Sequence, residues 1–158
     1  MNLRILRPSR QRLTAGDVFV MLPPEDRYLF GRVISTTAKW GANPSLTANL
    51  IYVFKVRSVA KTMPDRTELL SDRLLFAPVM TNRLPWSRGY FETITNLPLG
   101  EGEVLQQHCF RFSNHRCYDE HHRELSGPTE PCGEGGLHSF RTVDDLVSDA
   151  LGIPLAPD

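Results

Sequence analysis

The sequence has no long apolar run. No stretch approaches the roughly 20 apolar residues that a membrane-spanning helix requires. The first residues, MNLRILRPSRQRL, carry scattered arginines and no apolar segment of the kind that a secretory signal contains. Cysteine is also scarce, and its odd count of three fits a reducing compartment better than a disulfide framework. We therefore expect a cytoplasmic protein that does not contact a membrane.

Several common enzyme motifs are missing. The sequence contains no phosphate-binding Walker loop, no glycine-rich dinucleotide motif after a strand, no H-E-x-x-H pair and no G-x-S-x-G nucleophile turn. An excess of positive charge is missing too, because 18 Lys and Arg residues balance 18 Asp and Glu residues. Since nucleic-acid binding normally needs a basic surface, we expect no nucleic-acid partner.

The charge is nevertheless unevenly distributed along the chain. Residues 1–91 carry 14 basic and 6 acidic side chains, whereas residues 92–158 carry 4 basic and 12 acidic side chains. One interpretation is that the two halves neutralise each other within one fold. The other is that the second half presents an acidic face, which attracts a basic partner by electrostatic steering.

The pattern of apolar residues predicts an α+β fold that is mostly β. We expect residues 1–13 to form an irregular arm and residues 14–158 to form a single domain. The strand Asp17–Leu22 is apolar on both faces, so it belongs in the centre of a sheet. Further strands are expected at Tyr28–Ser35, Leu50–Val59, Leu74–Thr81 and Tyr90–Thr95, with a hairpin of His108–Phe112 and Arg116–Asp119.

The remaining segments are expected to be loops and short helical pieces. Loops are predicted at Thr36–Thr47, around NRLPWSRG and at Glu124–Gly136, and helical turns at Asp65–Ser71 and Glu101–Gln107. The C-terminal segment has the clearest pattern: Thr142 is a candidate N-cap and Gly152 a candidate stop signal. Its apolar residues recur with helical spacing, so we predict a helix at 142–151 docked on a strongly curved antiparallel sheet or partial barrel.

Reactive side chains are concentrated between Gln107 and Arg123. A tetrahedral metal such as zinc needs three or four thiolates or imidazoles. The candidate set, tied to an enzymatic function, is His108, His115, Cys117 and His121, although its spacing matches no standard zinc module. Otherwise we expect no cofactor.

Two other chemistries would use residues of this segment. A cysteine nucleophile at Cys109 needs a base from another strand, because its neighbour His108 points to the opposite face of a strand. The nearby carboxylates would serve acid–base chemistry only with shifted pKa values, and on an exposed hairpin they are solvated. We assign no catalytic residue.

Three segments together resemble a known family. They are LTAGDVFVMLPPEDRYLFGRVI (Leu13–Ile34), LPWSRGYFETITNLPL (Leu84–Leu99) and the region CFRF…CYDEHHREL…EPCGEGGLHSFRTVDDLVSDALGI (Cys109–Ile153). In this order they resemble the immunity protein 26 family of bacterial polymorphic toxin systems, in its longer branch that is named jointly with a small phosphotriesterase. The middle of the chain, Thr36–Arg83, carries no motif that matches.

The resemblance implies a cytoplasmic immunity protein that neutralises a cognate toxin by binding it, without catalysis. If the toxin is a basic nuclease, acidic residues complement it, and aromatic residues supply the contacts that dominate such interfaces. The candidate partner-binding residues are Trp40, Trp86, Tyr118, Asp119, Glu120, Glu124, Glu130 and Glu134.

Two alternative functions remain open at this point. The joint family name implies hydrolysis of organophosphate triesters by a metal-activated water, with the histidine and cysteine cluster as its site. The Gly-Asp-aliphatic strand also begins ribonucleases of the SH3-like toxin-barrel type. For that function the first hairpin offers Arg27 and Arg32, and the following loop offers Lys39.

Overall fold

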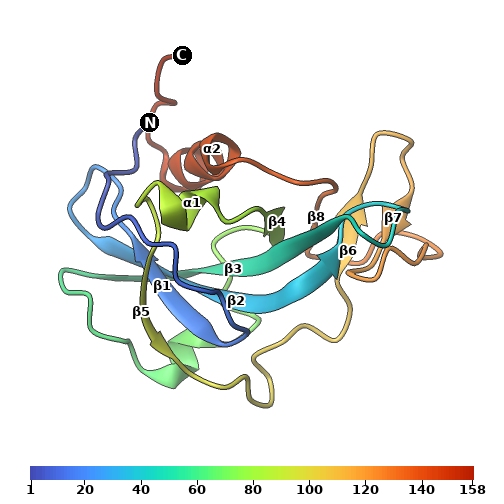
Figure 1. The fold of residues 1–158 in the computed structure, drawn as a ribbon, viewed down its shortest axis with the longest axis horizontal. Coiled ribbons are helices and arrows are strands. Elements are labelled where there is room, and N and C mark those ends of the chain that lie inside the picture. Colours follow the sequence, from blue (N-terminus) through green and yellow to red (C-terminus); the bar gives the residue numbers. More distant parts are fainter.

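The computed structural model describes all residues, 1–158, and consists of two sheets and two helices (Figure 1). The strands of the larger sheet are β1 (Asp17–Met21), β2 (Tyr28–Lys39), β3 (Thr47–Ser58), β4 (Val79–Thr81) and β5 (Glu92–Asn96). Their order is β4-β3-β2-β1-β5, and every neighbouring pair is antiparallel. The two edge strands do not pair with each other, so the sheet is open.

The smaller sheet has three very short strands in the order β7-β6-β8. They are β6 (Cys109–Arg111), β7 (Cys117–Tyr118) and β8 (Cys132–Glu134). Strand β6 is antiparallel to β7, as the predicted hairpin requires, and parallel to β8. This sheet lies at the far end of the long strands β2 and β3 (Figure 1).

Apolar residues cover the larger sheet on both faces, because successive side chains of a strand point in opposite directions. Phe19 and Met21 join the core beneath the helices α1 (Leu84–Ser87) and α2 (Phe140–Leu151). Val18 and Val20 join the core of the opposite face, together with Leu69 of the 3-10 turn η1 (Arg66–Leu69). The prediction of a central strand covered on both sides is confirmed.

The predicted fold class is also confirmed, since the chain is mostly β with one docked C-terminal helix. Helix α2 begins two residues earlier than predicted. Its N-cap is Ser139 rather than Thr142, and the Ser139 hydroxyl accepts a hydrogen bond from the Thr142 N–H. Gly152 ends the helix in a left-handed conformation, as expected of a helix stop signal. Val143 and Val147 of α2 are buried against the sheet.

Several local predictions were wrong. Strand β2 continues to Lys39 and β3 begins at Thr47, so the predicted loop between them is shorter. Helix α1 occupies the predicted loop NRLPWSRG, and β8 lies within the predicted loop Glu124–Gly136. The segment Glu101–Gln107 forms no helix. Each of these segments is short, so its conformation depends on tertiary contacts rather than on its own sequence.

Candidate functional site

The smaller sheet forms one end of the molecule together with the tip of the β2–β3 hairpin. The backbone N–H of Lys39, the last residue of β2, donates to the carbonyl of Glu120 over 2.8 Å. This contact places Trp40 beside the turn that follows β7. Trp40 and the segment Tyr118–Glu120, both predicted to bind a partner, therefore lie at the same end of the fold.

The three aromatic candidates differ in exposure. Trp40 is half-buried and packs against the core of the η1 face. Tyr118 is half-buried and stacks on His122, with ring centroids 4.3 Å apart. Trp86, by contrast, is only 2% exposed and contacts Phe19 and Phe91 in the core beneath the helices. In this structure Trp86 therefore offers almost no surface to a partner.

Two of the five acidic candidates are engaged inside the fold. Asp119 Oδ1 accepts hydrogen bonds from the backbone N–H groups of His121 and Arg123, each over 2.9 Å, and so holds the turn after β7. Glu120 lies 2.8 Å from His108 and 3.2 Å from His121. These carboxylates hold the turn in place, so fewer of their oxygen atoms are free to pair with a partner.

The other three acidic candidates are exposed. Glu124 lies 3.4 Å from Arg116, a surface pair in which both side chains are at least half exposed. Glu130 accepts a hydrogen bond from the Cys132 N–H, and Glu134 is the last residue of β8. We call the small-sheet surface the set of three exposed carboxylates and two half-buried aromatic residues: Glu124, Glu130, Glu134, Trp40 and Tyr118.

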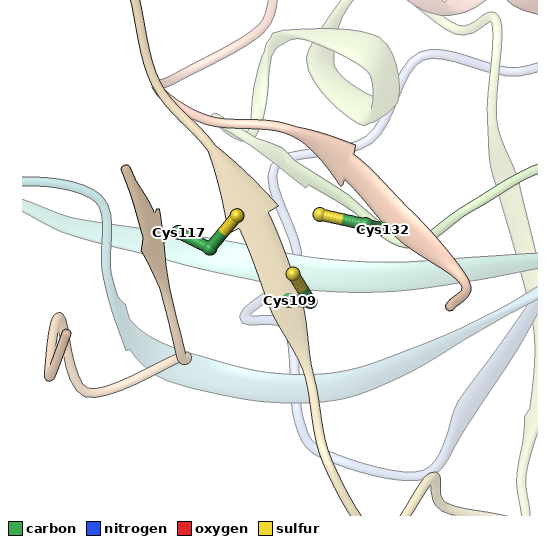
Figure 2. Close-up of side chains that lie close together, drawn as sticks. All are labelled: Cys109, Cys117 and Cys132. Atoms are coloured by element: carbon green, nitrogen blue, oxygen red, sulfur yellow. The ribbon is translucent and has the colours of Figure 1, made fainter. Parts of the chain in front are cut away.

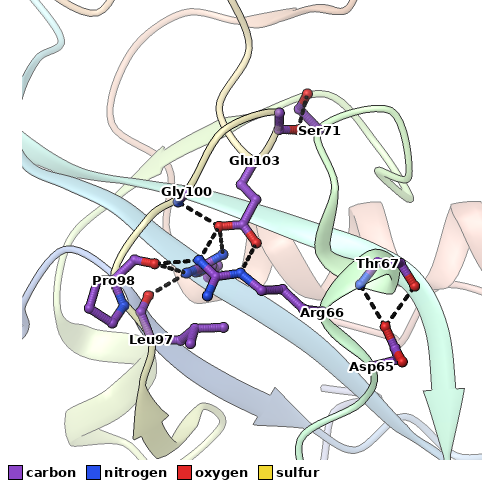
Figure 3. Close-up of polar contacts among 10 residues, drawn as sticks. Asp65, Arg66, Thr67, Ser71, Leu97, Pro98, Gly100 and Glu103 are labelled. Carbon is purple, nitrogen blue, oxygen red and sulfur yellow. Dashed lines mark hydrogen bonds and ion pairs between the residues drawn. The ribbon is translucent and has the colours of Figure 1, made fainter.

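One acidic residue of the second half, Glu103, is neutralised inside the fold by arginines of the first half. Glu103, only 2% exposed, lies between two arginines: its Oε1 is 3.1 Å from Arg32 and its Oε2 is 2.6 Å from Arg66 (Figure 3). The hydrogen bond from Arg66 is the main reason that the pKa of Glu103 falls to about 2. The interpretation that the two halves neutralise each other therefore holds for this cluster.

The same cluster removes Arg32 from any surface function. Its side chain is fully buried, and it donates to the carbonyls of Leu97 and Pro98 as well as pairing with Glu103. A buried guanidinium with these partners is unavailable to RNA. The ribonuclease alternative thereby loses one of the two arginines that the first hairpin offered.

A series of hydrogen-bonded side chains links the two sheets. The Tyr52 hydroxyl lies 2.6 Å from His108 Nε2, and His108 Nδ1 lies 2.8 Å from Glu120 Oε2. Tyr52 is fully buried, and burial raises its pKa to about 12, so its hydroxyl keeps its proton at neutral pH. The hydroxyl also accepts a hydrogen bond from the Leu105 N–H. Each group is satisfied, as stable buried polar networks require, and the network holds the smaller sheet to β3.

The predicted metal set is not assembled. His115 is exposed, His121 is exposed, and His108 is occupied by Tyr52 and Glu120. The one group of close metal-ligating side chains is Cys109, Cys117 and Cys132, one from each strand of the smaller sheet (Figure 2). Of the predicted set only Cys117 belongs to it. Burial is the main reason that the pKa of the Cys132 thiol is raised to about 12.

The sequence did not predict the cluster of three cysteine side chains, because their proximity depends on strand register. Cys109 and Cys132 are direct partners in the parallel pair β6–β8, which the prediction of a loop at Glu124–Gly136 excluded. A signal did exist in the sequence, since all three cysteines of the chain fall between residues 109 and 132.

Neither helix has the length and hydropathy that crossing a membrane requires.

Comparison with known proteins identifies the class. The family model of immunity protein 26 matches residues 14–117, which include the larger sheet, β6 and the first residue of β7. The chain belongs to the immunity protein 26 family. No curated protein and no solved structure matches it.

Proposed function

We propose that this protein neutralises a cognate bacterial toxin by binding it, without catalysing a reaction. The observation that carries the proposal is the family match over residues 14–117. The hydrolase alternative is not put forward in the form given above, because the four residues assigned to it, His108, His115, Cys117 and His121, do not come together around one metal position.

We propose further that the toxin docks on the small-sheet surface. Its three exposed carboxylates, Glu124, Glu130 and Glu134, offer negative charge to a basic toxin such as a nuclease. Tyr118 and Trp40 add aromatic area at the same end of the fold, and aromatic residues are enriched among the contacts that dominate binding energy. The buried polar network under this surface keeps it rigid, which lowers the entropy lost on binding.

The first experiment tests the class of function. Each candidate toxin domain from the neighbouring genes is expressed in a bacterial host, with and without this chain. We expect growth only when the chain is present, and co-purification of the two proteins at a fixed stoichiometry. Growth arrest in both cultures, with both proteins soluble, would contradict the proposal.

The second experiment tests the surface by reversing its charge. In the triple variant E124K/E130K/E134K we expect the association rate with the toxin to fall by about tenfold or more at low salt, because steering depends on complementary charge. The matched control is E101K/D149K/D158K, which makes the same change in net charge at three exposed positions outside the smaller sheet.

Rates measured over a series of salt concentrations separate the two variants. We expect the control to bind close to the wild-type rate and with the wild-type salt dependence. Equal rates for both triple variants would show that the small-sheet surface is not where the toxin binds, while leaving the class of function intact.

A further inference from the structure

The three cysteines of the smaller sheet form a compact group of thiols. Their Sγ atoms all lie within 4.8 Å of one another, although they come from three strands (Figure 2). In a tetrahedral zinc site with Zn–S bonds of about 2.3 Å, neighbouring sulfurs are roughly 3.8 Å apart. The most distant pair would thus need to close by no more than about 1 Å. Such a shift lies within the range of side-chain rotation.

We propose that Cys109, Cys117 and Cys132 bind one Zn²⁺ ion, with a water molecule as the fourth ligand. No histidine or carboxylate belongs to the group, so the protein supplies three sulfurs. Thiolates bind Zn²⁺ more strongly than Mg²⁺ or Ca²⁺, because those two ions prefer oxygen ligands. The proposal does not depend on the toxin-binding function.

The surroundings of the thiols suit a metal–thiolate centre. The Thr129 N–H points at Cys109 Sγ, 3.5 Å away, as an outer hydrogen-bond donor to a sulfur ligand. Arg111 is the cross-strand partner of Cys117 and follows Cys109 by two residues, so it lies on the thiol face of β6. Cys109 and Cys117 are buried, which shields the centre from competing ligands in solvent.

The charge balance is favourable. Binding forms three Zn–S bonds and releases the three thiol protons to solvent, so no oxidant or reductant is needed. One Zn²⁺ and three thiolates leave a net charge of −1. The Arg111 guanidinium on the same face offsets that charge.

The ion would explain how the smaller sheet is held together. Its strands contain only three, two and three residues, and strands this short provide little stability by themselves. A single ion joins all three strands and fixes β8 to the hairpin. It would therefore support the frame that carries the small-sheet surface.

The test begins with the reduced, chelator-stripped full-length chain under anaerobic conditions. Zn²⁺ is titrated into it against a chromophoric zinc chelator, and proton release is followed in weak buffer. We expect one equivalent to bind with release of close to three protons. Mg²⁺ at the same concentrations should not bind. Failure of the reduced wild-type chain to bind Zn²⁺ would overturn the proposal.

Variants identify the ligands. Each of C109S, C117S and C132S should weaken zinc binding by at least roughly 100-fold, since loss of a direct ligand exceeds the loss of an outer-shell partner. The matched controls are H115N and H121N, exposed neighbours in the same segment, and their affinity should stay at the wild-type level. Loss of binding in the histidine variants with retention in C109S would overturn the proposal.

A measurement on the wild-type chain guards against variants that fail to fold. X-ray absorption of the zinc-loaded protein should show three sulfur ligands at about 2.3 Å and one lighter ligand. A shell of nitrogen and oxygen only would contradict the proposal. So would protein isolated from cells with two of the three cysteines joined as a disulfide that persists under reducing conditions.

Discussion

At the scale of single residues, the most consequential interaction is the buried ion cluster of Glu103. Its carboxylate pairs with Arg32, which is fully buried, and with Arg66, whose side chain is half exposed. Removing one partner of a buried pair is costly, because the other charge stays in a medium that solvates it poorly. The cluster also connects the loop after β5 to β2 and to η1, so the loss affects several segments.

Replacing Glu103 by glutamine should destabilise the protein by about 3 to 5 kcal/mol, as expected when a buried charge loses its counter-charge. Urea unfolding at pH 7, followed by circular dichroism, measures the change. The control is E68Q, which removes an exposed pair with Arg73 and should cost less than about 1 kcal/mol. Equal effects of the two substitutions would contradict the assignment.

The pH dependence gives a separate check on Glu103. Its pKa is lowered from 4.5 to about 2 in the folded chain, so the unfolded chain binds the proton more tightly. The resulting stability, roughly 3 kcal/mol, is fully present above about pH 4.5 and is lost as the pH falls toward 2. Unfolding measured between pH 5 and pH 3 should show this loss in the wild type and a shallower slope in E103Q.

At the scale of secondary-structure elements, the pairing of β1 and β2 depends on a glycine. Gly31 is the direct partner of Phe19 across the two strands, and the Phe19 ring lies over it. That ring also stacks on Phe91 at a centroid distance of 4.6 Å and contacts Trp86 edge-on. The missing side chain at Gly31 therefore creates the space that one core aromatic residue occupies.

Substituting alanine for Gly31 should destabilise the fold by about 1 to 3 kcal/mol, the usual cost of adding a carbon atom to a packed core. Its Cβ would lie 2.5 Å from Phe19 Cε2, and the neighbouring aromatic rings prevent Phe19 from moving away. The control G127A adds a Cβ that meets no atom within 4 Å. Thermal unfolding should separate the two variants, and equal midpoints would contradict this role of Gly31.

At the scale of the whole molecule, the N-terminal segment is joined to the C-terminal helix. Residues 1–13 contain no helix or strand, yet Leu3 is buried in the core beneath the helices. The N–H groups of Asn2 and Leu3 donate to the two carboxylate oxygens of Asp144 on α2, over 3.1 and 2.6 Å. Since Asp144 is fully buried, these donors satisfy a charge that would otherwise be destabilising.

A double-mutant cycle tests this connection. Asp144→Ala should cost about 1 to 3 kcal/mol in the full chain, because two backbone donors lose their acceptor. In a chain lacking residues 1–13 the same substitution should cost little, since the donors are already gone. The control is D145A, whose partner Arg141 lies on the same helix, so its effect should be equal in both backgrounds. Urea unfolding measures all of the variants, and an equal cost of D144A in both backgrounds would contradict the connection.

The prediction of the fold from sequence succeeded where a segment carries a long, regular pattern. The continuous apolar run Val18–Met21 indicates a strand covered on both faces. The spacing of Val143 and Val147 indicates a helix, because burial of one helix face requires apolar residues four positions apart. Prediction failed at α1 and β8, which are too short for a pattern to develop. Trp86 was a candidate only because tryptophan is enriched at interfaces, and its sequence neighbours do not reveal the core that covers it.

The sequence by itself determined the family, the mostly β architecture and the two-sided burial of β1, because these follow from local motifs and periodicity. Only the tertiary structure decided which reactive side chains meet. Glu103 reaches Arg32 across the chain, His108 reaches Tyr52, and the three cysteines gather on one face of the smaller sheet. Such contacts depend on strand register and on how the two sheets dock. A shift of one residue in register would turn the thiols to the opposite face, and periodicity alone does not specify that register.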